Sequence, residues 1–169
     1  GSVVSSTING NAGQDVITIG AITAFTDSTV YGGAGQDTIN ASTSTVAVVL
    51  SGDDDTDILV GSNFADTIFG GDGDDTITGN LLADTMTGGA GVNTYVFANG
   101  AATGDVANGV VDVITDFKTS ADALTRDVIS GAFANGVVLT DGAAAGYATY
   151  ALALAAAAGS ATAAFIAAV

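Results

Sequence analysis

A nine-residue pattern recurs through the N-terminal part of the chain and constrains its fold more than any other feature of the sequence. The pattern is G-G-x-G-x-D-x-U-x, in which U is a large apolar residue. The units at Gly32 and Gly70 match it at every fixed position, and the unit at Gly10 lacks only the second glycine. From Gly52 onward the units follow one another without interruption every nine residues, and they begin at Gly52, Gly61, Gly70, Gly79 and Gly88. An uninterrupted run in one register is a specific signal, whereas a single G-x-G-x-D would be a weak one.

Each position of the pattern has a physical reason. Glycines reach positive φ and let carbonyl groups converge without a Cβ in the way, and the Asp closes the turn with a hard carboxylate of the kind that Ca²⁺ and Mg²⁺ prefer. The last three residues form a short strand whose central side chain points inward, because side chains alternate along a strand. Two units then make one coil, with a turn at each edge and two parallel sheets back to back. The inward residues expected to stack into a narrow core are Leu59, Ile68, Ile77, Met86 and Tyr95.

The charge of the chain restricts its partners. The formal net charge is −16, Lys118 and Arg126 are the only basic side chains, and all 18 acidic residues are Asp. Nucleic acids and anionic membranes require a basic face, so this composition argues against both and favours divalent cations. The absence of cysteine excludes disulfide bonds and thiolate metal sites. With no His, Cys or Glu the sequence also offers no catalytic set, and we expect no enzyme.

The chain resembles the RTX (repeats-in-toxin) family of calcium-binding β-rolls, which type I secretion exports. The repeats carry the resemblance, and residues 88–97 look like the family's closing unit. Residues 112–117, with Ser120, Ala121 and Asp122 shortly after, look like the strand and turn that cap the roll in serralysin-type proteases and S-layer proteins.

This resemblance implies an all-β fold and a secreted protein. We expect a right-handed parallel β-roll, the RTX solenoid, over residues 1–97, and a C-terminal capping and secretion-associated region over residues 98–169. The second region is expected to combine a β cap with a short Ala-rich helical segment. Its uncharged end, residues 142–169, is mostly Ala and is too weakly apolar for a membrane span. That end is either a helix packed on the cap, part of an export signal or an assembly surface.

In the family, each calcium ion lies between stacked loops. It takes positions two, four and six of one loop and positions one, three and six of the loop one coil later. The loops at residues 10, 32, 52, 70 and 88 can all stack on one edge, and those at 61 and 79 share the other. Carried over residue by residue, the implied Ca²⁺ ligands are Asn11, Gly13 and Asp15 with Gly32, Ala34 and Asp37; Gly33, Gly35 and Asp37 with Gly52, Asp54 and Asp57; Asp53, Asp55 and Asp57 with Gly70, Asp72 and Asp75; Gly71, Gly73 and Asp75 with Gly88, Ala90 and Asn93; and, on the second edge, Ser62, Phe64 and Asp66 with Gly79, Leu81 and Asp84.

The acidic loops have a simpler interpretation, in which solvated carboxylates point apart into water. One turn contains four of them, Asp53, Asp54, Asp55 and Asp57. At about 6 Å, with an effective dielectric constant near 20, each like-charge pair costs on the order of 2–3 kcal/mol. Several such pairs rival the whole stability of a small domain, about 5–15 kcal/mol. A solvated loop also leaves unexplained why position six is acidic in every unit except the last, so calcium binding is the better interpretation.

Two functions fit these features. The first is a calcium-dependent structural module of a cell-surface protein, such as an S-layer, whose partners are calcium ions, further copies of itself or other domains of a larger surface protein. The second is the export-and-folding module of a larger secreted enzyme, adhesin or toxin. The Ala, Thr and Gly bias and the absence of Pro and Glu favour the first. Ice binding through outward threonines is disfavoured, because Thr76 and Thr85 fall on opposite sheets and form no single Thr-x-Thr face.

Overall fold

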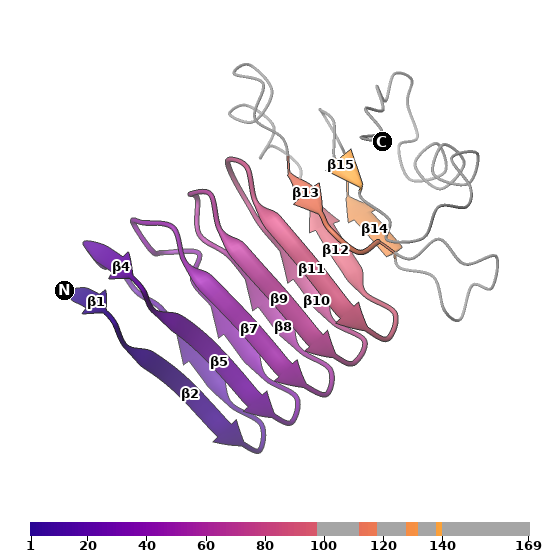
Figure 1. The fold of residues 1–169 in the computed structure, drawn as a ribbon, viewed down its shortest axis with the longest axis horizontal. Coiled ribbons are helices and arrows are strands. Elements are labelled where there is room, and N and C mark those ends of the chain that lie inside the picture. The colour runs from indigo at the N-terminus through magenta and orange to yellow at the C-terminus, as the bar shows by residue number, and fades with distance from the viewer. Residues whose placement is uncertain (98–111, 118–127, 132–137, 140–169) are drawn as a thin grey trace.

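The computed structural model describes residues 1–97, 112–117, 128–131 and 138–139, and in these the chain is all-β. Two parallel sheets run the length of the molecule back to back (Figure 1). The seven-stranded sheet contains β2 (Thr7–Ala12), β5 (Thr29–Ala34), β7 (Val49–Asp54), β9 (Thr67–Asp72), β11 (Thr85–Ala90), β13 (Val113–Ile114) and β15 (Val138–Leu139). The six-stranded sheet contains β3 (Val16–Thr18), β6 (Thr38–Asn40), β8 (Ile58–Val60), β10 (Thr76–Thr78), β12 (Thr94–Phe97) and β14 (Val128–Gly131). A small pair, β1 (Ser2–Val4) and β4 (Ala24–Thr26), lies at the N-terminal end. The predicted parallel β-roll is confirmed.

The chain alternates between the two sheets, so each coil contributes one strand to each. We number the coils one to five by their strands in the seven-stranded sheet, β2, β5, β7, β9 and β11. Leu50 pairs with Ile68 and Ile68 with Met86, which is the 18-residue period of two units. Val30, however, pairs with Ile8 and Leu50, at spacings of 22 and 20 residues. The first two coils therefore contain extra residues.

The extra residues all lie on one edge of the roll. On what we call the narrow edge, each link from the seven-stranded to the six-stranded sheet in coils one to five has three residues, such as Gly13–Asp15 between β2 and β3. On the opposite edge, the wide edge, the links are residues 19–28, 41–48, 61–66 and 79–84, so they shorten to six residues and then stay constant. An insertion is tolerated where the turn is free to vary, and solenoids collect insertions on one side for this reason.

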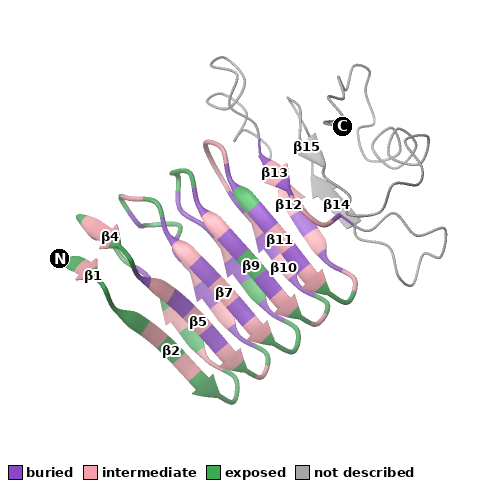
Figure 2. Ribbon diagram, viewed as in Figure 1, coloured by how far each residue is buried: buried purple, intermediate pink, exposed green. Residues whose placement is uncertain are grey.

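A single row of side chains from each sheet fills the space between the sheets. In Figure 2 the buried residues accordingly alternate with less buried ones along the strands. The predicted inward residues are all buried, with exposed fractions of 0–1%. Each fully buried aliphatic side chain stabilises the fold by about 1.5–3 kcal/mol. Among the described residues, the buried core consists of Ile19, Val30, Ile39, Ala41, Val48, Leu50, Leu59, Ile68, Ile77, Met86, Tyr95, Ile114 and Phe117.

Beyond coil five, short strands extend both sheets. β13 pairs with β11 and β14 pairs with β12. The ring of Phe117 packs against that of Tyr95, with centroids 6.0 Å apart. The predicted Ala-rich helical segment lies outside the described residues, and the division of the chain at residue 97 stays a prediction. Within the described ranges, no helix has the length and apolar character needed to cross a membrane.

Candidate metal sites along the edges of the roll

The five glycine-rich loops stack directly on one another along the narrow edge. Strand register aligns their second positions, pairing Asn11 with Gly33, Gly33 with Asp53, and Asp53 with Gly71. Positions two and four have positive φ in every loop. At position two, φ lies between 77° and 117° for Asn11, Gly33, Asp53, Gly71 and Gly89. At position four, φ lies between 76° and 136° for Gly13, Gly35, Asp55, Gly73 and Gly91. Where glycine is absent the residue is Asn or Asp, the side chains that tolerate this region best. The residue types at positions two and four of the repeat are therefore those that the positive φ of the backbone requires.

This backbone brings carbonyl oxygens into the gap between successive loops. The carbonyl of Asn11, at position two of coil one, lies so close to Gly33 that a Cβ there would collide with it. The carbonyl of Gly32, at position one of coil two, faces back toward coil one, and a Cβ on Gly10 would lie 2.5 Å from it. The backward-facing carbonyl recurs at Gly52, Gly70 and Gly88. Oxygens from positions two and one thus face each other across each gap.

Position three contributes carbonyls that already accept a hydrogen bond. Gly13 N–H donates to Ala34 O at 2.7 Å, and Gly35 N–H donates to Asp54 O at 3.3 Å. A carbonyl oxygen has two lone pairs, so these atoms keep one for a cation.

The aspartates at position six form a ladder along the narrow edge. Oδ1 of Asp37 accepts a hydrogen bond from the backbone amide of Asp15 at 2.8 Å, and Oδ1 of Asp57 accepts one from the amide of Asp37 at 2.7 Å. The series continues from Asp57 N to Asp75 Oδ1 at 2.9 Å and from Asp75 N to Asn93 Oδ1 at 3.0 Å. Asn93 thus accepts the same hydrogen bond as the aspartates of the series but carries no charge. Each side chain joins its own coil to the coil before it.

The second oxygen of these carboxylates faces the gap between loops. Within the described part of the chain, Oδ2 of Asp15, Asp37 and Asp57 is buried and accepts no hydrogen bond. A Cβ on Gly32 would lie 2.5 Å from Asp37 Oδ2 and 2.6 Å from the carbonyl of Gly52, so these two oxygens approach the same point. A buried carboxylate oxygen without a donor is costly. A cation among these oxygens would remove that cost.

Repulsion between the carboxylates along the ladder also favours a bound cation. Successive position-six side chains stand about one strand spacing apart, ~4.8 Å. At an effective dielectric constant near 20, two charges at that distance repel by about 3–4 kcal/mol. Lys118 and Arg126 lie outside the described residues, so no Lys or Arg side chain offsets this repulsion within them. Hard oxygen ligands that are partly backbone carbonyls and partly carboxylates are the donor set of Ca²⁺.

The arrangement differs from a compact carboxylate cluster. No three acidic side chains of the described residues converge closely enough to hold a metal by themselves. On the narrow edge each loop supplies one side chain at position six, an aspartate in coils one to four and Asn93 in coil five, and most of the remaining ligands would be carbonyls. Ca²⁺, which takes six to eight oxygens in flexible geometry, suits such a site better than Mg²⁺, which requires a small octahedron.

Acidification is expected to stabilise the metal-free roll. Burial, and then the charges of Asp75, Asp37 and Asp53, raise the pKa of Asp57 from 3.8 to about 7, although the hydrogen bond from the amide of Asp37 opposes the shift. Because the folded pKa exceeds the unfolded one, this carboxyl stabilises the fold fully below pH 3.8 and loses that effect as the pH rises through 7. Circular dichroism in chelator should therefore show more β-structure at about pH 5 than at about pH 8.

Protons should also compete with calcium, so the calcium midpoint is expected to be higher at about pH 6 than at about pH 8. Replacing Asp57 by Asn should weaken both effects, because it removes the group whose pKa is raised. Loss of β-structure on acidification in chelator would contradict the argument.

The wide edge carries a second, shorter ladder. Val48 N donates to Asp66 Oδ1 at 2.8 Å, and Asp66 N donates to Asp84 Oδ1 at 2.8 Å. In the loop of residues 79–84, Asn80 and Leu82 have positive φ of 86° and 67°, as positions two and four do on the narrow edge. This loop therefore reaches the same backbone conformation without glycine.

The loop of residues 61–66 has a different conformation. Ser62 donates to Asp66 from its backbone amide and from its hydroxyl, and Phe64 N donates to Ser62 Oγ at 3.0 Å. Burial raises the pKa of Asp66, and the hydrogen bonds from Val48 and Ser62 oppose that shift. Both oxygens of Asp66 thus accept hydrogen bonds from protein groups. The structure brings the predicted set of Ser62, Phe64, Asp66, Gly79, Leu81 and Asp84 to one edge, with the Asp66 carboxylate already bonded.

Two aspartates beyond the repeats also belong to these edges, and the predicted ligand sets did not include them. Asp112 Oδ1 accepts the amide of Asp84 at 2.9 Å and so extends the wide-edge ladder. Its signal was present in the sequence, because Asp112-Val-Ile-Thr repeats the last four positions of the unit without the glycines.

Asp116 ends the narrow-edge stack. Its carboxylate accepts hydrogen bonds from Gly88 N at 2.9 Å, Gly89 N at 2.7 Å and the Tyr95 hydroxyl at 3.2 Å. A Cβ on Gly88 would meet the Tyr95 hydroxyl at 2.5 Å, where the earlier loops meet the carbonyl of the next coil. No repeat position predicts this contact.

Comparison with known families agrees with this geometry. The family model of the RTX calcium-binding nonapeptide repeat, in four copies, matches residues 26–43 and 51–85. Comparisons with curated proteins and with solved structures return no match. The matched segments contain loops of both edges, and Ca²⁺ is the ligand expected of such repeats. The chain thus carries RTX calcium-binding nonapeptide repeats over residues 26–43 and 51–85, and its repeats form a parallel β-roll.

Proposed function

We propose that the chain is the calcium-dependent structural module of a secreted cell-surface protein, which folds and then associates with further copies of itself when calcium binds. The observation that carries the proposal is the narrow-edge ladder of buried aspartates, whose Oδ2 atoms in Asp15, Asp37 and Asp57 face carbonyl oxygens and accept no hydrogen bond. RTX repeats occur in secreted proteins, where millimolar calcium is available.

In this proposal, the ions lie in the gaps between successive loops. The four narrow-edge ligand sets implied by the family pattern occupy the four gaps between successive loops of coils one to five. The wide-edge set occupies the gap between the loops of residues 61–66 and 79–84. The alignment of positions two and the carbonyls that face each other across each gap support these sets. Asp112 is a candidate addition on the wide edge, next to the loop of Asn80 and Leu82.

Calcium would also change how two copies meet. Acidic copies repel one another unless ions screen or bridge them. About five bound Ca²⁺ ions would add ten positive charges and take the net charge from −16 to roughly −6. The same ions would order the surfaces that must meet. Binding would therefore lower repulsion and prepare the interface in one step.

The second candidate is an export-and-folding module, with the roll at residues 1–97 and a capping and secretion-associated region at 98–169. The continuation of both sheets by β13 and β14 favours it, because a cap that completes a solenoid is what such a module needs. This function requires calcium-dependent folding but no self-association. The two candidates therefore differ in a measurable property.

Calcium at about 1–5 mM, a range above the affinity of extracellular calcium modules, is expected to produce particles larger than the monomer, seen by light scattering and as ordered sheets or filaments by electron microscopy. Magnesium at equal concentration is the control and should neither fold nor assemble the chain, since its small octahedral shell fits these loops poorly. A chain that folds fully in calcium yet remains monomeric at high concentration would favour the export module.

A further inference from the structure

The outer face of the six-stranded sheet carries no charged side chain over strands β3, β6, β8, β10 and β12. Its outward side chains form two columns, which are Val16, Thr38, Ile58, Thr76 and Thr94, and Thr18, Asn40, Val60, Thr78 and Val96. Most are β-branched. Val16 is 79% exposed and Ile58 48% exposed, so the face includes large apolar side chains in contact with water.

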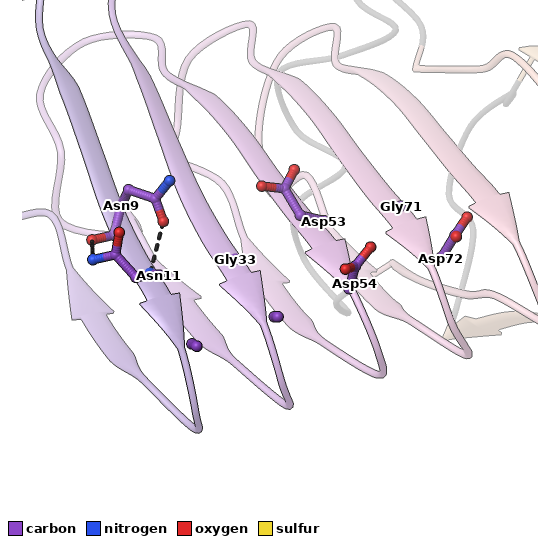
Figure 3. A pocket seen from close by; sticks show the side chains of 9 residues that line it. Asn9, Asn11, Gly33, Asp53, Asp54, Gly71 and Asp72 are labelled. Atoms are coloured by element: carbon purple, nitrogen blue, oxygen red, sulfur yellow. Dashed lines mark hydrogen bonds between the residues drawn. The ribbon is translucent and has the colours of Figure 1, made fainter.

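The outer face of the seven-stranded sheet differs in charge and shape. Toward the narrow edge it is hollowed into an open concavity lined by Asn9, Asn11, Asp53, Asp54 and Asp72, together with small residues (Figure 3). Asp54 and Asp72 are Cα partners on adjacent strands and are both exposed. A second copy that docked here would bring two such acidic sets together. The six-stranded face presents no such obstacle.

We propose that the outer face of the six-stranded sheet is where a second copy of this chain docks. The inference rests on the proposed function, because it names the surface through which calcium-loaded copies associate. In a molecule of net charge −16, a face without carboxylates is where like-charged copies can approach most closely. Sheets that pack face to face lie about 10 Å apart.

The size of the face predicts a weak contact. Five strands at ~4.8 Å spacing and three residues at ~3.3 Å give a footprint of about 20 Å by 10 Å. Stable protein interfaces bury about 800 Å² on each partner, so this face alone is too small for a permanent dimer. A growing assembly can use weak contacts, because many of them act together. β-branched side chains help, since they have few rotamers to lose on burial.

Matched substitutions on the two faces test the proposal. Ile58→Glu places a charge on the six-stranded face, and Phe69→Glu places the same charge on the seven-stranded face, where Phe69 is 41% exposed. Each variant is studied as the full chain at a calcium concentration that saturates its circular dichroism change. Sedimentation velocity over a concentration series then measures association. Ile58→Glu is expected to weaken association at least about tenfold, and Phe69→Glu to leave it near that of the unmodified chain.

A second pair guards against failure to fold. Thr76→Glu and Thr67→Glu change the same residue type at the same repeat position, on the six-stranded and the seven-stranded sheet respectively. Association that survives both six-stranded substitutions, or that is lost through Phe69→Glu instead, would overturn the docking face and leave calcium-triggered assembly intact. An unmodified chain that folds in calcium and stays monomeric would overturn both.

Discussion

In a chelator the chain is expected to lose most of its β-structure, and calcium should restore it. The reason is the narrow-edge ladder, in which Asp37 and Asp57 are buried with no basic side chain beside them among the described residues. Repulsion of about 3–4 kcal/mol for each neighbouring pair approaches the net stability of a small domain, about 5–15 kcal/mol. Binding free energy then becomes folding free energy.

The far-UV circular dichroism signal measured during a calcium titration checks this result. The midpoint is expected at about 10⁻⁴–10⁻³ M, the range of extracellular calcium modules. Sodium chloride at matched ionic strength is the control and should not replace calcium, because salt screens buried charges much less than exposed ones. Equal β-content in EDTA and in calcium would refute the argument.

The core explains why calcium is expected to have so much influence on folding. Each regular coil of 18 residues buries one large inward side chain from each sheet, such as Ile68 and Ile77 in coil four. Ordering each residue of a coil costs about 1–2 kcal/mol of backbone entropy, and the roll has no second layer of side chains to offset it. Ions bound at the edges would therefore be a main source of stability.

The repeat predicted those features that depend on one local rule. The inward position of Leu59 and Ile77 follows from the alternation of side chains along a strand. The need for glycine at positions two and four follows from positive φ, and Asn11, Asp53 and Asp55 mark where a polar residue replaces it. These rules act within nine residues, so one sequence is enough to apply them.

Features that depend on contacts between distant segments were not predictable in the same way. The sequence shows that the first coils are long but not which edge takes the extra residues, because either turn could lengthen. The contact of Asp116 with Gly88 and Gly89 joins residues separated by a segment with no repeat signal. Ser62 likewise changes the wide-edge loop through a hydrogen bond to Asp66 that the repeat pattern does not contain.

Asp57→Asn is expected to stabilise the fold in the absence of calcium and to weaken the binding of calcium. Asn93 shows that an amide can occupy position six and keep the ladder hydrogen bond, here to Asp75 N. The substitution should therefore preserve the geometry while removing a charge that Asp37 and Asp75 both oppose. In chelator the variant should contain more β-structure than the unmodified chain, because that repulsion is gone.

With calcium the same variant should bind more weakly, because two of the proposed sites share Asp57. Fewer ions per chain and a midpoint raised about tenfold, equal to ~1.4 kcal/mol, are the expected results of calorimetry and circular dichroism. Asp27→Asn is the matched control, since it removes the same charge from an exposed residue that belongs to no proposed site and whose φ of 49° also suits Asn. If the two variants bind calcium alike, Asp57 is not a ligand and the loops hold their ions in another register. If Asp57→Asn is less folded than the unmodified chain in chelator, the ladder is held together by its hydrogen bonds more strongly than its charges drive it apart.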